Sequence, residues 1–145
     1  MKLGTDTKIM IDSNIWISGF LFHGNEMKII LDMIIKGIQP SICITIINEL
    51  DLVLSEKFGF SREIVNGVLD VIISMSMIED EIEDHILLRD QDIRILETAS
   101  SANCDLLITG DKRLLGKVSH GRLKIISTRD FIYSKDNSNS EINVM

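Results

Sequence analysis

The sequence has little of several residues that define special classes of protein. Its 145 residues include one proline, two cysteines and one tryptophan, and aromatic residues make up only 5% of the chain. One proline excludes a collagen-like chain, and 45% hydrophobic residues exclude a disordered one. No hydrophobic run approaches the roughly 18 residues of a membrane-spanning helix. We see no secretion signal at the N-terminus and expect one cytoplasmic domain.

The two cysteines, Cys43 and Cys104, both lie within hydrophobic stretches. A chain of this length buries roughly two-thirds of its unfolded surface, so it folds without disulfides or a structural metal. We therefore expect two buried free thiols in a reducing compartment, not a disulfide framework or a zinc site.

Acidic residues outnumber basic ones. The chain has 22 Asp and Glu against 15 Lys and Arg, a net charge of −7, which argues against a general nucleic-acid binder. The charges are segregated, however, because residues 79–92 are strongly acidic and residues 112–135 are strongly basic. The basic segment could hold phosphates, and the alternative is a solvated surface.

Short hydrophobic runs alternate with helical patterns along the chain. The runs predict strands at residues 8–11, 40–44, 75–78, 106–109 and 123–126. Helical spacing predicts helices over 25–36, 45–57, from Ser61 onward, over 92–103 and over 128–133. Continuous hydrophobic strands are typical of strands covered on both faces, so we predict an α/β fold with a parallel sheet between helix layers.

Four acidic residues lie next to the predicted strands. Asp12 follows the strand predicted at 8–11, and Asp111 follows the one at 106–109. Glu49 lies in the first turn of the helix after the strand at 40–44, and Asp92 begins the helix that precedes the strand at 106–109. Ligands of open parallel sheets bind at the carboxyl ends of the strands, so the four acids could converge there. Clustered carboxylates repel one another, and a hard cation such as Mg²⁺ or Mn²⁺ removes this repulsion. Such an ion activates a water molecule for attack on a phosphodiester.

Each acid also has a purely structural interpretation. Asp12 can end a strand in a turn, and Glu49 can be an acid favoured by the helix dipole. Asp90 or Asp92 can be the N-cap of its helix, and Asp111 can cap the short helix that follows it.

Three segments resemble the PIN-domain family. They are IDSNIW at residues 11–16, INEL at 47–50 and, most strongly, RDQDIRILETASSANCDLLITGDKRLL at 89–115. A TGD motif alone is weak, but four ordered acids with TGD after a hydrophobic strand are fairly specific. The resemblance spans roughly residues 8–130 and extends to the branch of toxins in VapC-like toxin–antitoxin systems.

The resemblance implies a three-layer α/β/α PIN-like domain over residues 1–133, and we expect residues 134–145 to be a disordered polar tail. It implies a Mg²⁺- or Mn²⁺-dependent endoribonuclease whose partners are RNA, a cognate antitoxin and a second copy of the chain. The residues that match the catalytic and metal-binding acids are Asp12, Glu49, Asp92 and Asp111. Asp92 is preferred to Asp90 because its distance from the next strand resembles the family pattern.

Four further residues are implied by the matched motifs and assigned to substrate binding. Asn14 matches the polar residue that supports the first aspartate, and Thr109 matches the hydroxyl residue of TGD. Lys112 and Arg113 directly follow that motif and are candidates for phosphate contact. Exposed helix residues without such a role are the alternative for these two.

Two other classes of function compete with the ribonuclease. A phosphatase could use Asp12 as a nucleophile, although the second acid that usually follows two residues later is replaced by Asn14. A non-catalytic PIN-like module could bind RNA or protein with vestigial acids. A metal-free ribonuclease is disfavoured because no pair of histidines is placed as acid and base.

The scarcity of aromatic residues leaves few candidates for recognition of unpaired RNA bases. Trp16, Phe20 and Phe22 follow the first predicted strand. Core packing or a dimer contact is the favoured use of these three side chains.

Overall fold

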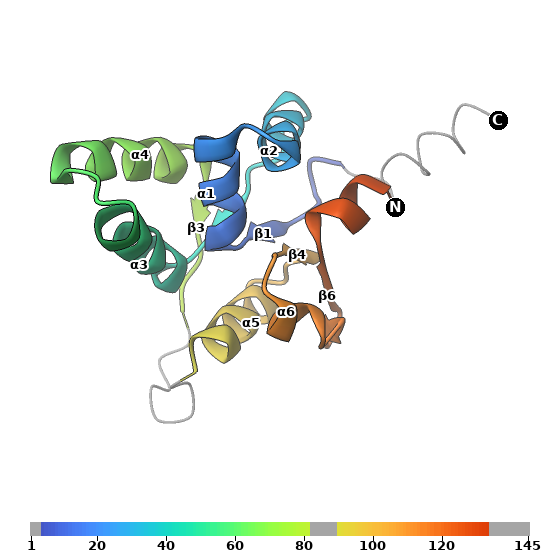
Figure 1. The fold of residues 1–145 in the computed structure, drawn as a ribbon. Coiled ribbons are helices and arrows are strands. Elements are labelled where there is room, and N and C mark those ends of the chain that lie inside the picture. The colour runs from blue at the N-terminus through green and yellow to red at the C-terminus, as the bar shows by residue number, and fades with distance from the viewer. Residues whose placement is uncertain (1–3, 82–89, 134–145) are drawn as a thin grey trace.

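The central feature of the molecule is a sheet with helices on both faces (Figure 1). The computed structural model describes residues 4–81 and 90–133. Within these residues, the strands follow the order β3-β2-β1-β4-β6-β5. All neighbours are parallel except β5 and β6, which are antiparallel. The strands are β1 (Ile9–Ile11), β2 (Ser41–Ile42), β3 (Met77–Ile78), β4 (Leu106–Ile108), β5 (Ser119–His120) and β6 (Leu123–Ile126).

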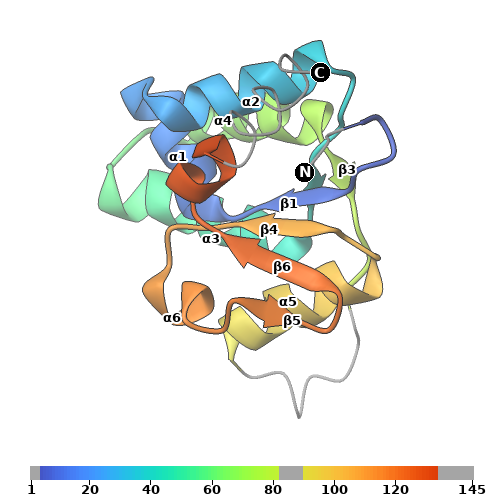
Figure 2. The ribbon, with the colours of Figure 1, turned by 90° about the vertical axis from the view of Figure 1, so that its right-hand side faces the viewer.

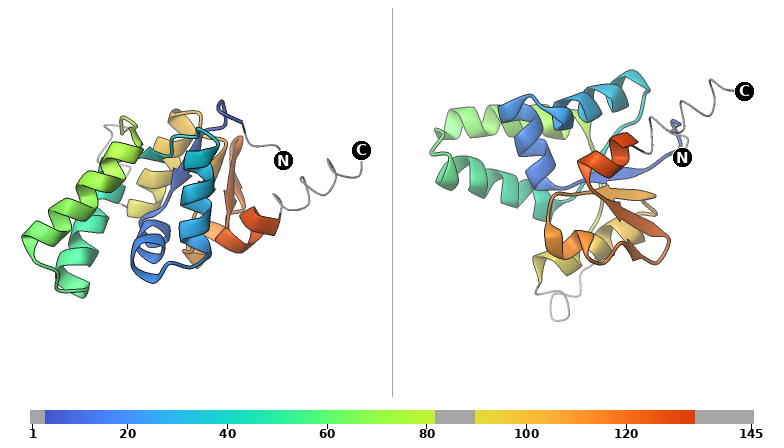
Figure 3. Two further views of the ribbon diagram at one scale, coloured as in Figure 1. Left: turned by 90° about the horizontal axis from the view of Figure 1, so that it is seen from above. Right: turned by 45° about the vertical axis from the view of Figure 1, so that its right-hand side comes forward.

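Helices connect the parallel strands and cover the sheet. Figure 2 shows α2 and α4 above the sheet and α5 below it. From above, α3 and α4 form a pair beside α1 and α2 (Figure 3). The helices are α1 (Ser13–Phe22), α2 (Asn25–Ile35), α3 (Ile44–Leu52), its π-helical continuation η1 (Val53–Lys57), α4 (Arg62–Met75), α5 (Gln91–Ser101) and α6 (Lys112–Leu115), with a last helical segment at residues 128–133. The predicted α/β fold is confirmed, with one antiparallel edge strand added to the parallel sheet.

The two central strands determine where the acidic residues meet. Every residue of β1 and β4 is buried, as expected for parallel strands between helix layers. Ile11 pairs with Ile108 at the carboxyl ends of these strands. The chain therefore leaves the sheet at Asp12 and Thr109 side by side.

Helix α1 is the largest element that the sequence pattern did not predict. It is hydrophobic on nearly all sides, so it lacks the polar face by which an amphipathic helix is identified. Trp16 is fully buried in the core, and Gly19 allows close packing against α2. A Cβ atom at Gly19 would lie 2.8 Å from the Cδ1 atom of Ile30.

Smaller differences concern the ends of elements. The helix predicted from Thr45 begins at Ile44, with Cys43 at its N-cap position. The helical segment predicted from Thr128 is capped by the preceding residue, Ser127, whose hydroxyl accepts from the backbone N–H of Asp130 at 3.1 Å. The expected tail at 134–145 and residues 82–89 of the acidic segment lie outside the described residues.

The expectation of two buried free thiols is confirmed. Cys43 and Cys104 are both buried and unpaired. Burial raises the pKa of the Cys43 thiol to about 12, which keeps it protonated and poorly nucleophilic at neutral pH. In the described part of the chain, no helix is long and apolar enough to cross a membrane.

Candidate active site

Asp12 occupies the position where β1 becomes α1. It is the N-cap of α1, and the residue is 4% exposed. One carboxylate oxygen, Oδ1, accepts from the backbone N–H of Ser13 at 2.8 Å. The other, Oδ2, accepts from the Thr109 hydroxyl at 2.6 Å. Both oxygens of this buried carboxylate are therefore held by donors from two different strand ends.

The Thr-Gly-Asp turn after β4 completes this connection. The Thr109 hydroxyl donates to Asp12 and accepts from the backbone N–H of Asp111 at 3.1 Å. The Asn14 side-chain oxygen accepts from the backbone N–H of Gly110 at 3.1 Å. Asp111 in turn caps α6, because its Oδ1 accepts from the backbone N–H of Arg113 at 2.8 Å. The turn is thus fixed against the first turn of α1.

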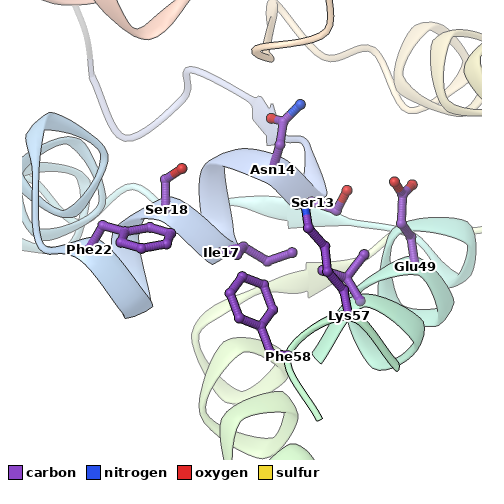
Figure 4. A pocket seen from close by; sticks show the side chains of 9 residues that line it. Ser13, Asn14, Ile17, Ser18, Phe22, Glu49, Lys57 and Phe58 are labelled. Carbon is purple, nitrogen blue, oxygen red and sulfur yellow. The ribbon is translucent and has the colours of Figure 1, made fainter. Parts of the chain in front are cut away.

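Glu49 reaches the same edge of the sheet from α3. Its Oε2 accepts from the side-chain amide of Gln91 at 2.5 Å, which links α3 to the start of α5. Figure 4 shows Glu49 beside Ser13, with Asn14 on the same side of α1. No sequence pattern indicates a role for Gln91, because this contact joins residues 42 positions apart.

Asp90 and Asp92 have different surroundings. Asp90 is the N-cap of α5, and its Oδ1 accepts from the backbone N–H of Asp92 at 2.8 Å. Asp92 forms the closer ion pair with Arg113, whose Nε lies 3.0 Å from Asp92 Oδ2, while Arg113 Nη2 lies 3.7 Å from Asp90 Oδ1. The Asp92 side chain is 16% exposed, whereas Arg113 is 73% exposed. The capping role therefore belongs to Asp90, and the side chain of Asp92 extends toward α6.

The pKa shifts show that these acids act on one another. Burial raises the pKa of Asp12, hydrogen bonds from Thr109 and the Ser13 backbone lower it, and the charges of Asp111 and Asp92 raise it further. Burial also raises the pKa of Glu49, and so does the charge of Asp12, while a hydrogen bond with the Ser13 side chain lowers it. Asp92 and Asp111 raise the pKa of Glu49 as well. The structure thus brings the four predicted acids into one electrostatic cluster.

The chemistry of this cluster fits a hard divalent cation. Its donors are carboxylate oxygens, and their mutual repulsion is the kind that Mg²⁺ or Mn²⁺ relieves. In residues 4–81 and 90–133, the side chains as placed form no group of three His, Cys, Asp or Glu that could hold a metal ion. Arg113 supplies positive charge to Asp92 in this arrangement.

The residues assigned to substrate binding lie in different settings. Thr109 is fully buried and its hydroxyl faces Asp12 and Asp111, so it can position those acids. Asn14 lies at the surface of the cluster and binds the Thr-Gly-Asp turn. Lys112 is exposed on α6, next to Arg113.

A groove adjoins the acidic cluster on the side of α1 and α3. Ser13, Asn14 and Glu49 line one part of it, and Phe22 and Phe58 line another (Figure 4). The sequence pattern identified neither Phe58 nor Lys57 as a site residue. Both belong to this groove, whose volume is about 490 Å³.

Comparison with known proteins identifies the family. The model of the PIN domain matches residues 8–113, most of the described chain, and the protein therefore belongs to the PIN-domain family. PIN domains are generally nucleases, which makes this chain a member of a family of hydrolases that act on nucleic acids. A search of curated proteins finds no match to the sequence.

Two solved structures share the fold. A chain of VapBC2 from Rickettsia felis, in a structure bound to a DNA fragment from their promoter, superposes with a TM-score of 0.63. It is 19% identical, and the match covers 83% of this chain and 98% of that one. PAE2754 from Pyrobaculum aerophilum superposes with a TM-score of 0.62 at 15% identity, covering 90% of this chain and 97% of that one.

Proposed function

We propose that this protein is a Mg²⁺- or Mn²⁺-dependent endoribonuclease that hydrolyses RNA phosphodiester bonds. The observation that carries the proposal is that Asp12 and Asp111, after β1 and β4, lie close enough to Glu49 of α3 and Asp92 of α5 for the four charges to interact, in a chain of the PIN-domain family. Asp12, Glu49, Asp92 and Asp111 are the residues that would hold the metal ion. A bound divalent cation supplies Lewis acidity, which stabilises charge on the phosphate and lowers the pKa of a water molecule.

The residues of the chain divide the remaining work. Asp12 is the most constrained acid, because Thr109 and the Ser13 backbone hold both of its oxygens. Gln91 and the Ser13 side chain hold Glu49 in place, and its carboxylate would orient the attacking water and accept its proton. The raised pKa of Glu49 strengthens it as a proton acceptor relative to an exposed glutamate. Thr109 is a positioning residue in this scheme.

Cations and amides around the cluster would hold the RNA backbone. We assign Asn14, Lys112 and Arg113 to phosphate or sugar contacts, because they surround the acids at the surface. Arg113 would exchange its contact with Asp92 for one with the substrate once Asp92 takes part in metal binding. The bound cation and these basic residues would offset the negative charge of the acids at the site, so the net negative charge of the protein would not prevent RNA from binding there.

The direct test is cleavage of total RNA by the purified protein with Mg²⁺ or Mn²⁺ and with a chelator. We expect cleavage that requires the metal ion and is lost in Asp111→Asn. Asp130→Asn, a change to an exposed acid in the last helix, is the matched control and should cleave normally. Cleavage that survives Asp111→Asn would refute the assignment. The absence of cleavage in the unmodified protein would favour a non-catalytic module.

We further propose that the ribonuclease is the toxin of a toxin–antitoxin pair. The support is the likeness of the fold to a chain of VapBC2, together with the family. Expression of the unmodified protein should arrest growth, and expression of Asp111→Asn should not. Co-expression of the neighbouring open reading frame should restore growth if that frame encodes the antitoxin. Growth arrest by both forms would separate toxicity from the acidic site.

A further inference from the structure

The groove between α1 and the α3–η1 segment contains an unusual combination of side chains beside the acidic cluster. We call it the α1–α3 groove. Its apolar part is formed by Ile17, Val53 and the rings of Phe22 and Phe58, and Lys57 adds a cation. Its polar part includes Asn14 and Glu49, which belong to the acidic site (Figure 4). The groove and the candidate active site therefore share a wall.

The two aromatic rings of the groove contact each other in a tilted arrangement, and one of them is largely exposed. Phe22 is 67% exposed, so the expectation of core packing does not apply to this ring. The centroids of Phe22 and Phe58 are 6.5 Å apart and their planes are inclined by 55°, so the rings are not stacked on each other. Phe58 is stacked on Phe60, with centroids 5.8 Å apart and planes inclined by 12°, which restricts the movement of the Phe58 ring. A planar group entering the groove would meet an anchored ring and an exposed one.

These features match the chemistry of an unpaired nucleotide. Aromatic rings bind single-stranded nucleic acid by stacking on its bases, and a nearby cation holds the backbone. The volume of about 490 Å³ lies within the range of pockets for small ligands. A strand with its phosphate at the carboxylates can place a neighbouring base in a groove that shares Glu49 and Asn14 with that site. A base paired in a duplex could not present its face to these rings.

We propose that the α1–α3 groove is a base-binding subsite for an unpaired nucleotide of the RNA substrate. This inference rests on the proposed ribonuclease function and names the form of RNA that the site prefers. Phe22 and Phe58 hold the base by stacking, and Lys57 contacts the adjoining phosphate. Selection of single-stranded or looped RNA follows from this arrangement.

The test measures the affinity of the protein for fluorescein-labelled RNA by anisotropy. The probes are a mixed-sequence single strand and the same strand in a perfect duplex. Ca²⁺ replaces Mg²⁺ because it binds carboxylates with longer bonds and looser geometry, and each sample is checked for cleavage on a gel. We expect Phe22→Ser to weaken binding of the single strand about tenfold, the loss of one stacked base. Binding of the duplex should not change.

Two variants serve as controls. Phe22→Trp retains an aromatic face and should restore binding of the single strand. Tyr133→Ser removes a ring that is 68% exposed in the last helix, outside the groove, and should leave the affinity unchanged. Because Phe22 is largely exposed, its replacement should preserve the fold, which thermal unfolding will check.

The outcomes separate this inference from the proposed function. Suppose that the unmodified protein cleaves total RNA and that Phe22→Ser matches it in both cleavage and affinity for the single strand. That result would overturn the subsite but would still support the proposed nuclease function. Binding through Phe22 without metal-dependent cleavage would support the subsite and refute the nuclease. Neither binding nor cleavage would refute both.

Discussion

At the scale of single residues, Thr109 influences the pKa of Asp12 through a hydrogen bond. Its hydroxyl donates to one oxygen of the buried carboxylate and accepts a hydrogen bond from the backbone N–H of Asp111. A buried carboxylate without this donor would hold its proton more tightly, because the hydrogen bond lowers the pKa of Asp12.

Removal of this hydroxyl gives a prediction in two readouts. Thr109→Val should cost about 1–3 kcal/mol in the free energy of unfolding, because it leaves buried polar groups without a partner. The acidic limb of the pH–rate profile should also move to higher pH, since Asp12 must be ionised to act. Urea unfolding and cleavage rates across pH measure the two effects. Thr109→Ser keeps the hydroxyl and should leave the pH–rate profile in place, losing only the stability of one buried methyl group. A valine variant that behaves like the unmodified protein would contradict the role of the hydroxyl.

Arg113 occupies a position where two functions compete. It neutralises Asp92 in the structure, and it lies where a phosphate contact is proposed. A metal ion and Arg113 cannot both be the main cation at Asp92. The ion pair therefore opposes metal binding while the same charge favours RNA binding.

The variant Arg113→Gln should separate these effects. The concentration of Mn²⁺ that gives half-maximal cleavage should fall, because Asp92 is released. The KM for RNA should rise, because a phosphate contact is lost. Steady-state kinetics at several Mn²⁺ concentrations measures both quantities. Shifts of the two in the same direction would show that Arg113 has a single role.

At the scale of elements, several boundaries depend on contacts that a sequence pattern does not contain. The N-terminus of α3 is capped by Glu81, whose carboxylate accepts from the backbone N–H of Thr45 at 2.6 Å across 36 positions. The side chain of Cys43 makes no capping hydrogen bond. A local search for Ser, Thr, Asp or Asn therefore places this cap on Thr45, which lies inside the helix.

The central strands are easier to predict from sequence than the short edge strand β5 or helix α1. The runs at β1 and β4 are hydrophobic throughout, because helices cover both faces of the sheet there. In β6, buried Leu123 and Ile125 alternate with more exposed residues, and the run is still mostly hydrophobic. The two-residue strand β5 has the polar residues Ser119 and His120 and is formed by pairing with β6, so no hydrophobic run indicates it. Helix α1 was missed for the opposite reason, since its hydrophobic residues surround the helix.

The position of the acids was predictable because it follows from the direction of parallel strands. Once β1 and β4 are neighbours, Asp12 and Asp111 must lie near each other. The contacts that hold these acids were not predictable. Gln91 at Glu49 and Arg113 at Asp92 join separate elements, and only the packing of α3, α5 and α6 determines them.

Helix α4 offers a test of local helix energetics away from the site. Gly67 lies in its interior at an exposed position, and a Cβ atom there would meet no atom within 4 Å. Gly67→Ala should raise the free energy of unfolding by about 0.4–1 kcal/mol, because alanine loses less backbone entropy on folding. Chemical denaturation measures the change, with cleavage activity unchanged. A loss of stability would indicate a contact that the helix surface does not show.

At the scale of the whole molecule, the acidic cluster makes stability depend on pH and metal ions. Asp12 and Glu49 have pKa values raised in the folded protein, so the folded state binds their protons more tightly than the unfolded state. Linkage then makes the metal-free protein less stable as pH rises from the unfolded pKa values through the folded ones. Asp105 has the opposite sign, because its pKa is lowered, and its contribution is lost only as pH falls below its ordinary value.

The prediction is a stability that declines with rising pH in chelator, from about pH 4 upward. Asp12→Asn should flatten this decline and leave the metal-free protein as stable as the unmodified one or slightly more so. It should also abolish cleavage. Thermal unfolding across pH, in chelator and in Mn²⁺, measures these effects. A large loss of metal-free stability in Asp12→Asn would show that Asp12 is chiefly a structural cap.

The central claim is that Asp12, Glu49, Asp92 and Asp111 together form a site for a divalent cation. Electron paramagnetic resonance tests it most directly, because the sharp signal of free Mn²⁺ broadens when the ion is bound. The purified protein should show saturable Mn²⁺ binding that is lost in Asp12→Asn and Asp111→Asn and retained in Asp130→Asn. Equal binding by all four proteins, or no binding by the unmodified one, would contradict the account.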